Sequence, residues 1–202
     1  MGEDGGAGDE RFQRAITAID EANAADPNVL TVGGKPRPKE LAHGEMVTDW
    51  VRRLCPDASE ALLLAARAHH IKRWHSPRSA YPDGRKGYLR WRTDLHAFHA
   101  NEVAAIMAAA GYDAETIART QQIVRKQRLG RDPDVQVLED AMCMVFLQTQ
   151  LDDVSEKIDD EKLIDVLRKT WRKMSPQAQQ LALTLDLSPR GLGLVRRALG
   201  VD

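Results

Sequence analysis

The spacing of apolar residues is the feature that most restricts the fold of this chain. From Glu10 onward, apolar residues mostly recur every three or four positions, as Phe12, Ala15, Ile16 and Ile19 do. That period places them on one face of an α-helix, and no segment shows the alternation of a convincing strand. Proline, glycine and aspartate clusters separate the periodic segments. The sequence therefore predicts an all-α protein.

The expected helices are joined by short connections and two longer loops. Short connections such as residues 56–59 and 111–113 contain residues that end one helix and cap the next. The two longer loops cover residues 26–37, with a Gly-Gly pair expected as a flexible turn, and residues 75–87; loops of this size often carry function. The helices are expected at residues 10–24, 39–54, 58–74, 92–110, 113–128, 133–153, 158–173, 175–184 and 188–199.

The length and composition are typical of one compact domain. A chain of 202 residues that is 43% hydrophobic can bury a proper core, so residues 10–202 are expected to form a single multi-helix domain. Residues 1–9 contain four glycines and three acids and have almost nothing to bury. They are expected to be a disordered tail.

Charge and cysteine usage restrict the environment and the partners. The formal net charge of −1 gives no general attraction to nucleic acid or membranes. No apolar run reaches ~18 residues, so no membrane segment is expected, and no stretch near the N-terminus resembles a signal peptide. Cys55 and Cys143 lack a CxxC spacing. A cytoplasmic protein is the expectation.

Histidines fall on the predicted buried faces of two helices. His43 is followed by apolar residues at i+4, i+7 and i+11, so its imidazole is expected to face the core. The apolar segment 62–68 leads directly into His69 and His70. Adjacent helical side chains diverge by ~100°. Both therefore face one site only if it lies between them; otherwise, one binds and the other supports it or faces solvent.

Asp140 and His99 complete the set of candidate metal ligands. Asp140 lies in an otherwise apolar helix, where a carboxylate needs a cation or several donors; an ion pair with an arginine is the alternative. His99 lies on the inward side of its helix and is expected as a further ligand or a substrate contact. The predicted ligands of one divalent metal are His43, His69, His70 and Asp140, with the choice between the two adjacent histidines left open. The residue types allow Mn²⁺, Fe²⁺, Co²⁺ or Ni²⁺.

The order of these residues resembles that of the HD superfamily of metal-dependent phosphohydrolases. In that all-α family a histidine, a His-Asp pair and a distant aspartate bind metal, and the pair ends an apolar helix. His43, the His69-His70 pair and Asp140 follow the same order. If His69 matches the family histidine, His70 stands where the family has aspartate; if His70 matches it, Ile71 stands there and one ligand is lost. The resemblance implies an HD-like fold and gives His70 and Asp140 a catalytic role at the metal.

A second resemblance covers nearly the whole folded chain. It is to an uncharacterised family of bacteria and fungi, known only as a domain of unknown function, and it implies no reaction. The segments that carry it are Arg73-Trp74, Tyr81-Pro82, Gly87-Tyr88-Leu89-Arg90-Trp91-Arg92 and Leu163-Ile164-Asp165-Val166-Leu167-Arg168-Lys169-Thr170-Trp171.

A basic and aromatic segment follows the histidine pair. Arginine binds phosphate or carboxylate through a planar fork, and aromatic rings stack on a base or a sugar. Arg73, Arg90 and Arg92 are the predicted phosphate contacts, Trp91 or Tyr88 the predicted stacking residue, and His99 a substrate contact. The loop 75–87 is expected to cover the site as a lid. A solvated loop whose arginines pair with acids elsewhere is the alternative.

These observations predict a metal-dependent hydrolase of a small phosphorylated, nucleotide-like molecule, in which the metal activates water. The alternative from another class is a non-catalytic helical adaptor that binds RNA or a protein through residues 72–92. Iron-dependent oxygenation, which also occurs on HD-like scaffolds, is a further alternative. The oligomeric state is not predicted.

Overall fold

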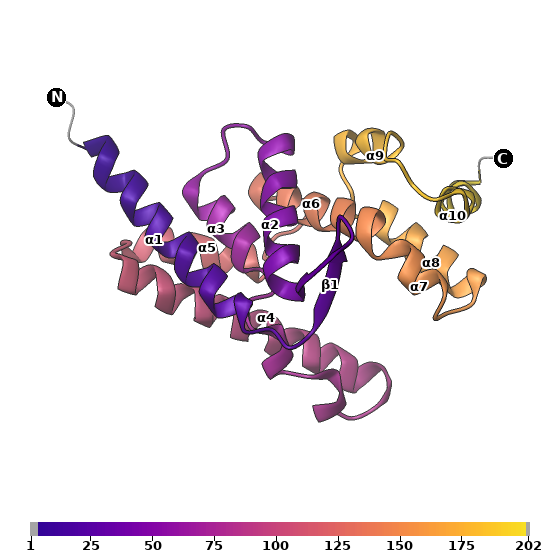
Figure 1. Cartoon of the computed structure of the whole chain (residues 1–202), viewed down its shortest axis with the longest axis horizontal. Coiled ribbons are helices and arrows are strands. Elements are labelled where there is room, and N and C mark those ends of the chain that lie inside the picture. The colour runs from indigo at the N-terminus through magenta and orange to yellow at the C-terminus, as the bar shows by residue number, and fades with distance from the viewer. Residues whose placement is uncertain (1–3, 201–202) are drawn as a thin grey trace. The chain divides into compact units, whose positions relative to one another are not determined.

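A computed structural model describes residues 4–200 of the chain, and its elements are helical except for one small hairpin (Figure 1). The all-α prediction is confirmed. The contacts group residues 1–127 and 128–202 into two compact units, here called unit 1 and unit 2. The expectation of a single domain over residues 10–202 stays a prediction. None of the helices in the described part of the chain combines the length and apolar character of a membrane span.

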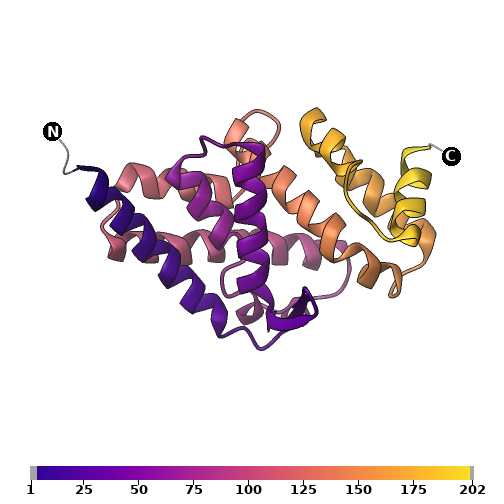
Figure 2. The ribbon, with the colours of Figure 1, turned by 45° about the horizontal axis from the view of Figure 1, so that its top comes forward.

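Unit 1 is a bundle of five helices in which α3 is central, since it contacts each of the other four (Figures 1 and 2). Its buried side chains include Ile19, Val47, Leu62, Leu64 and Met107. Ser59 and Asp113 cap α3 and α5, because their side chains accept from backbone N–H groups three residues ahead. The helices are α1 (Asp4–Ala24), α2 (Lys39–Leu54), α3 (Glu60–Ala68), α4 (Gly84–Ala110) and α5 (Ala114–Val124).

The start of α1 differs from expectation. A disordered tail was expected over residues 1–9, but the helix begins at Asp4. Residues 1–3 lie outside the described part of the chain.

The loop expected at residues 26–37 is instead a β-hairpin. Strands β1 (Val29–Val32) and β2 (Lys35–Pro38) pair antiparallel with Val32 opposite Lys35. Gly33 and Gly34 form the turn with φ of +56° and +77°, the left-handed region that glycine enters without strain. The hairpin contacts α2, and Arg37 donates to Glu45 of that helix at 2.9 Å. The prediction of a strandless chain is therefore wrong at this point.

The loop expected at residues 75–87 is also shorter than predicted. Two short 3-10 helices, η1 (Arg73–His75) and η2 (Arg78–Ala80), occupy its first part, and α4 begins at Gly84. At Gly87 a Cβ atom would lie 1.9 Å from the carbonyl oxygen of Pro82, so only glycine allows this close approach. The basic and aromatic residues 88–92 therefore lie on the first turns of α4.

Four of the five helices described in unit 2 begin at a side-chain cap. Asp132, Asp159, Ser175 and Ser188 cap α6, α8, α9 and α10 with side-chain oxygens, and proline follows the cap in three of the four. The helices α8 and α10 pack against each other. The elements are α6 (Pro133–Thr149), α7 (Leu151–Ser155), α8 (Asp160–Trp171), α9 (Pro176–Ala182) and α10 (Pro189–Leu199).

Candidate metal centre

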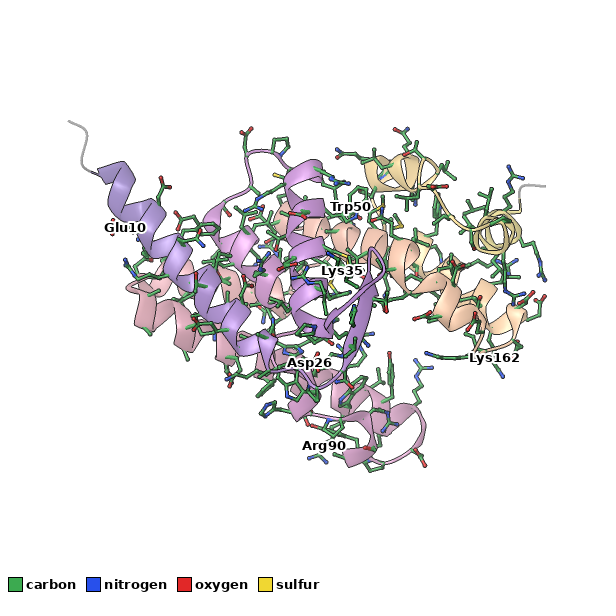
Figure 3. The ribbon with its side chains drawn as sticks, in the orientation of Figure 1. Glu10, Asp26, Lys35, Trp50, Arg90 and Lys162 are labelled. Carbon is green, nitrogen blue, oxygen red and sulfur yellow. The ribbon has the colours of Figure 1, made fainter. Side chains whose placement is uncertain are left out.

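His43 lies on the buried face of α2, as its helical phase predicts. The residue is 4% exposed, and Val47, Trp50 and Leu54 are buried on the same helix. Asp26, between the end of α1 and the start of α2 (Figure 3), accepts the backbone N–H of Glu40 at 3.0 Å. This bond satisfies a donor in the first turn of α2, which intrahelical bonding leaves without a partner. The hydrogen bond from Glu40 to Asp26 therefore helps to fix the start of α2.

The end of α3 allows both adjacent histidines to face His43. The helix stops at Ala68, and Lys72 follows in a left-handed conformation with φ of +50°. The ring centroid of His43 lies 5.0 Å from that of His69 and 5.1 Å from that of His70. The three rings each offer one nitrogen within 4.8 Å of the others. We call His43, His69 and His70 the histidine triad.

Hydrogen bonds set the tautomers of two triad members. Nδ1 of His69 lies 2.7 Å from the carbonyl oxygen of Ala66, which can only accept, so Nδ1 carries the hydrogen. Its Nε2 therefore has a lone pair and accepts a hydrogen bond from His43 Nδ1 at 3.1 Å, so His43 carries its hydrogen on Nδ1. A backbone carbonyl that holds one imidazole nitrogen leaves the other as a metal ligand. His69 is in the tautomer that binds metal through Nε2.

His70 lies between a cation and a carboxylate. Nη1 of Arg73 donates to His70 Nε2 at 3.0 Å, and Nδ1 lies 3.2 Å from Oε2 of Glu40. The His70 side chain is 21% exposed, so it is the triad member that solvent reaches most easily. The Nε2 lone pair of His70 accepts the hydrogen bond from Arg73. The guanidinium must therefore move before His70 can bind a metal through Nε2.

His99 has a buried nitrogen without a partner. Its Nδ1 lies 2.8 Å from the carbonyl oxygen of Ile71 and its ring centroid 5.8 Å from that of His70. Nε2 is buried and forms no hydrogen bond. A buried polar atom without a hydrogen bond destabilises the fold unless a ligand or ion binds it. His99 is therefore brought beside the triad, as the prediction of a ligand or substrate contact requires.

Burial keeps these four histidines neutral. Removal from water lowers the pKa of His43 to about 4 and that of His99 to about 3. Burial, with the neighbouring imidazoles as the next cause, lowers the pKa of His69 and His70 well below 6.5. Burial acts in the opposite direction on the carboxyl of Glu40 and raises its pKa to about 7, although Arg73 opposes the shift. Neutral imidazoles bind metal without first losing a proton.

Metal-free protein is expected to lose stability as the pH falls from about 6.5 toward 4. In this window the unfolded chain binds protons at four histidines that stay neutral when folded, and each lowers the free energy of unfolding by up to about 1.4 kcal/mol per pH unit. Glu40 changes the free energy of unfolding in the opposite direction. Its folded pKa is raised from 4.5 to about 7, so its stabilisation of the fold is lost as the pH rises through that range. Four groups outweigh one, and thermal unfolding across this pH range measures the net effect.

Two variants separate this cause from general acid unfolding. His99→Gln removes one buried imidazole and is expected to make the melting temperature less dependent on pH. His75→Gln replaces an exposed histidine outside this cluster and is the matched control. A wild-type melting temperature that stays constant from pH 6.5 to about 4 contradicts the assignment of neutral buried histidines.

The predicted substrate contacts occupy different environments. Arg73 connects the triad to α4, since its guanidinium carbon lies 5.2 Å from the Trp91 ring centroid while Nη1 reaches His70. Trp91 is held by a 2.9 Å hydrogen bond to the carbonyl oxygen of Ser76. Arg92 lies 5.9 Å over the Tyr88 ring. Arg90 extends from the outer surface of α4 (Figure 3), with a side chain that is 76% exposed.

Asp140 belongs to unit 2 and has partners there. The residue is 3% exposed, and its Oδ1 accepts from the backbone N–H of Ser175 and from Nε2 of Gln136, both at 2.9 Å. Ser175 caps α9, so Asp140 helps to fix the start of that helix. These donors give its burial a structural cause. Its role as a metal ligand and catalytic residue stays a prediction.

Comparison with known proteins places the chain in a family. Residues 13–195 match the family described as Domain of unknown function (DUF4202). The chain belongs to this family. The match confirms the second of the two resemblances noted above. Neither a curated protein nor a solved structure matches the chain.

Glu40 of this DUF4202 chain is not among the predicted site residues. It lies three positions before His43 on the same buried face of α2, and its side chain is 6% exposed. The i,i+3 spacing that places two side chains on one helical face is visible in the sequence. The sequence does not show that the first turn of α2 is buried, because the preceding residues 26–37 were expected as a loop and not as a hairpin that contacts α2.

Proposed function

We propose that this protein is a metal-dependent hydrolase of a small phosphoester, with its metal bound by the histidine triad. The observation that carries the proposal is the convergence of three buried or half-buried imidazoles from α2 and the end of α3. Buried imidazoles of this kind are satisfied by core hydrogen bonds or by a metal. The cluster leaves His99 Nε2 without a partner, which favours a ligand.

The donor set fits a divalent transition metal. Ligand nitrogens about 2.1 Å from a metal lie about 3.0–3.4 Å from one another. His43 Nδ1 and His69 Nε2 already lie 3.1 Å apart through a hydrogen bond, and a metal that binds both would replace that bond once the hydrogen of His43 moves to its Nε2. The remaining triad distances, all within 4.8 Å, need a modest contraction. His70 would bind through Nδ1, or through Nε2 once Arg73 withdraws. Imidazole suits several such ions, and Mn²⁺, Fe²⁺, Co²⁺ and Ni²⁺ are the candidates.

A bound metal of this kind would supply a water of lowered pKa and polarise a phosphoryl oxygen. The residues of the chain supply binding and orientation. Arg73, once it leaves His70, is close enough to the triad to bind a phosphate oxygen through its guanidinium fork. Trp91 lies against Arg73 and offers an aromatic surface to the organic part of the ester. The order of His43, His69-His70 and Asp140 along the chain adds the HD-like resemblance as support.

The first experiment is elemental analysis of protein purified without added metal or chelator. About one or two equivalents of a transition metal are expected, and chelation should abolish hydrolysis in a screen of phosphomonoesters and nucleotides. Asp140→Ala tests the fourth predicted ligand: loss of metal supports it, whereas full metal content with a less stable unit 2 assigns Asp140 to structure. Wild-type protein that binds none of the four candidate ions contradicts the proposed function.

The first turns of α4 favour a second candidate function, binding of RNA. Tyr88 and Leu89 are 43% and 52% exposed and lie among the exposed cations Arg85, Lys86 and Arg90. Exposed aromatics among cations are typical of single-strand binding surfaces. This candidate predicts steeply salt-dependent binding of RNA by protein that holds no metal.

A further inference from the structure

The carboxylate of Glu40 is buried beside the triad without a hydrogen bond to Oε2. The side chain is 6% exposed, and Oε2 lies 3.2 Å from His70 Nδ1 without the alignment of a hydrogen bond. The nearby guanidinium of Arg73 donates to His70 Nε2 instead. A carboxylate in such a place destabilises the fold unless something else binds it.

The separations around Glu40 match the edges of a metal coordination shell. Oxygen and nitrogen ligands about 2.0–2.2 Å from one ion lie about 3.0–3.5 Å apart. Glu40 Oε2 to His70 Nδ1 is 3.2 Å, and His43 Nδ1 to His69 Nε2 is 3.1 Å. The Glu40–His70 pair has this spacing without a hydrogen bond, and the His43–His69 pair has it through a hydrogen bond that a shared ion would replace.

Helix geometry gives Glu40 and His43 a common direction. A Glu-x-x-His spacing places a carboxylate and an imidazole one above the other on a single helical face, and helical bundles use this spacing to hold metal ions. Both residues are buried on α2. The bond from the Glu40 backbone to Asp26 fixes the turn that carries the carboxylate.

We propose that Glu40 is a carboxylate ligand of the metal held by His43, His69 and His70. The first turns of α2 and the end of α3 then supply four ligands, three imidazoles and one carboxylate. This inference rests on the proposed function only in requiring that the triad binds a metal. It explains why a buried carboxylate has no hydrogen bond at Oε2, and it leaves Arg73 free for a substrate anion once a dication replaces it beside Glu40.

Titration with Co²⁺, followed by its visible absorption, tests the inference on the full chain. Glu40→Gln keeps the shape of the side chain and removes the charge; it is expected to weaken Co²⁺ binding roughly 10- to 100-fold and to change the ligand-field spectrum. At a pH where Glu40 is ionised, metal-free Glu40→Gln should melt at the same temperature as the wild type or higher, because a buried unpartnered charge is gone. Glu45→Gln is the matched control, since Glu45 lies on the same helix but pairs with Arg37, and it should bind Co²⁺ like the wild type.

The outcomes distinguish this inference from the proposed function. Wild-type protein that binds Co²⁺ while Glu40→Gln gives the same affinity and spectrum overturns the ligand role of Glu40 and leaves the metal proposal intact. Wild-type protein that binds no metal overturns the proposed function itself. If Glu40→Gln does not fold, Glu40→Asp keeps the charge but withdraws it by one methylene group. Weaker Co²⁺ binding by a folded Glu40→Asp then supports the inference, and unchanged binding and spectrum contradict it.

Discussion

Replacing His69 with asparagine is expected to abolish stoichiometric metal binding and phosphoester hydrolysis together. Asparagine can still donate to the carbonyl of Ala66, as His69 Nδ1 does, but it has no atom at the position of Nε2. A complete zinc site with four ligands is worth about 10–16 kcal/mol, so one ligand contributes about 3 kcal/mol, or at least a hundredfold in affinity. Calorimetric titration with Mn²⁺ or Co²⁺ measures this change directly.

The matched control for this variant is His75→Asn. His75 is exposed at the end of η1, and its ring contacts only Trp74 among the described aromatic residues. This variant should keep the metal affinity and the rate of hydrolysis of the wild type. If His69→Asn is folded and still binds metal with wild-type affinity, the triad is a hydrogen-bonded core cluster and the hydrolase proposal fails at its first step.

Helical periodicity was enough to predict that His43 faces the core, but it left open which of His69 and His70 does so. His43 follows the apolar phase of α2, and His69 ends the apolar helix α3. It could not predict that His70 joins them, because that depends on where α3 stops. A helix continued through residue 74 would turn His70 about 100° away from His69. The chain leaves the helix after Ala68, and the local turn places both rings beside His43.

The errors in the predicted elements have local physical causes. Residues 29–38 contain two prolines, which disfavour a strand in most settings, but a two-stranded hairpin has open edges where no N–H donor is required. The Gly33-Gly34 pair, expected only as a flexible turn, is the signal for such a hairpin. The early start of α4 depends on Gly87, whose missing side chain lets the helix approach the carbonyl of Pro82. The start of α4 is thus set by a steric contact with Pro82 and not by the pattern of apolar residues.

Asp140 illustrates why chemistry cannot be assigned from burial alone. Its helical phase correctly predicts an inward carboxylate, 3% exposed. The prediction allowed a cation or several donors as partners, and unit 2 supplies two donors from Ser175 and Gln136. Glu40, by contrast, is buried at Oε2 without such a donor. An unsatisfied oxygen on a buried carboxylate is therefore a stronger indication of a metal than burial alone is.

Gly44→Ala is expected to destabilise the fold by about 2 kcal/mol and to weaken metal binding about tenfold. A Cβ atom at this position would lie 2.6 Å from the carbonyl oxygen of Arg67, where α2 packs against α3. Overpacking against backbone costs about 1–3 kcal/mol or more, because backbone cannot rotate away as a side chain does. The gain of about 1 kcal/mol in helix propensity from glycine to alanine does not offset a contact this short. Urea unfolding and Co²⁺ titration of the same samples measure both effects.

The effect on the metal follows from the position of Gly44. It directly follows His43, and the atom it would strike lies two residues before His69, so any separation of the helices at this point also separates the two imidazoles whose nitrogens are 3.1 Å apart. Gly193→Ala is the matched control, since this helical glycine in α10 has nothing within 4 Å of an added Cβ and should become slightly more stable without any change in Co²⁺ affinity. If Gly44→Ala loses stability but keeps full metal affinity, the triad does not depend on the close approach of α2 and α3. Loss of both properties in this variant alone would identify that approach as the feature that brings the histidines together.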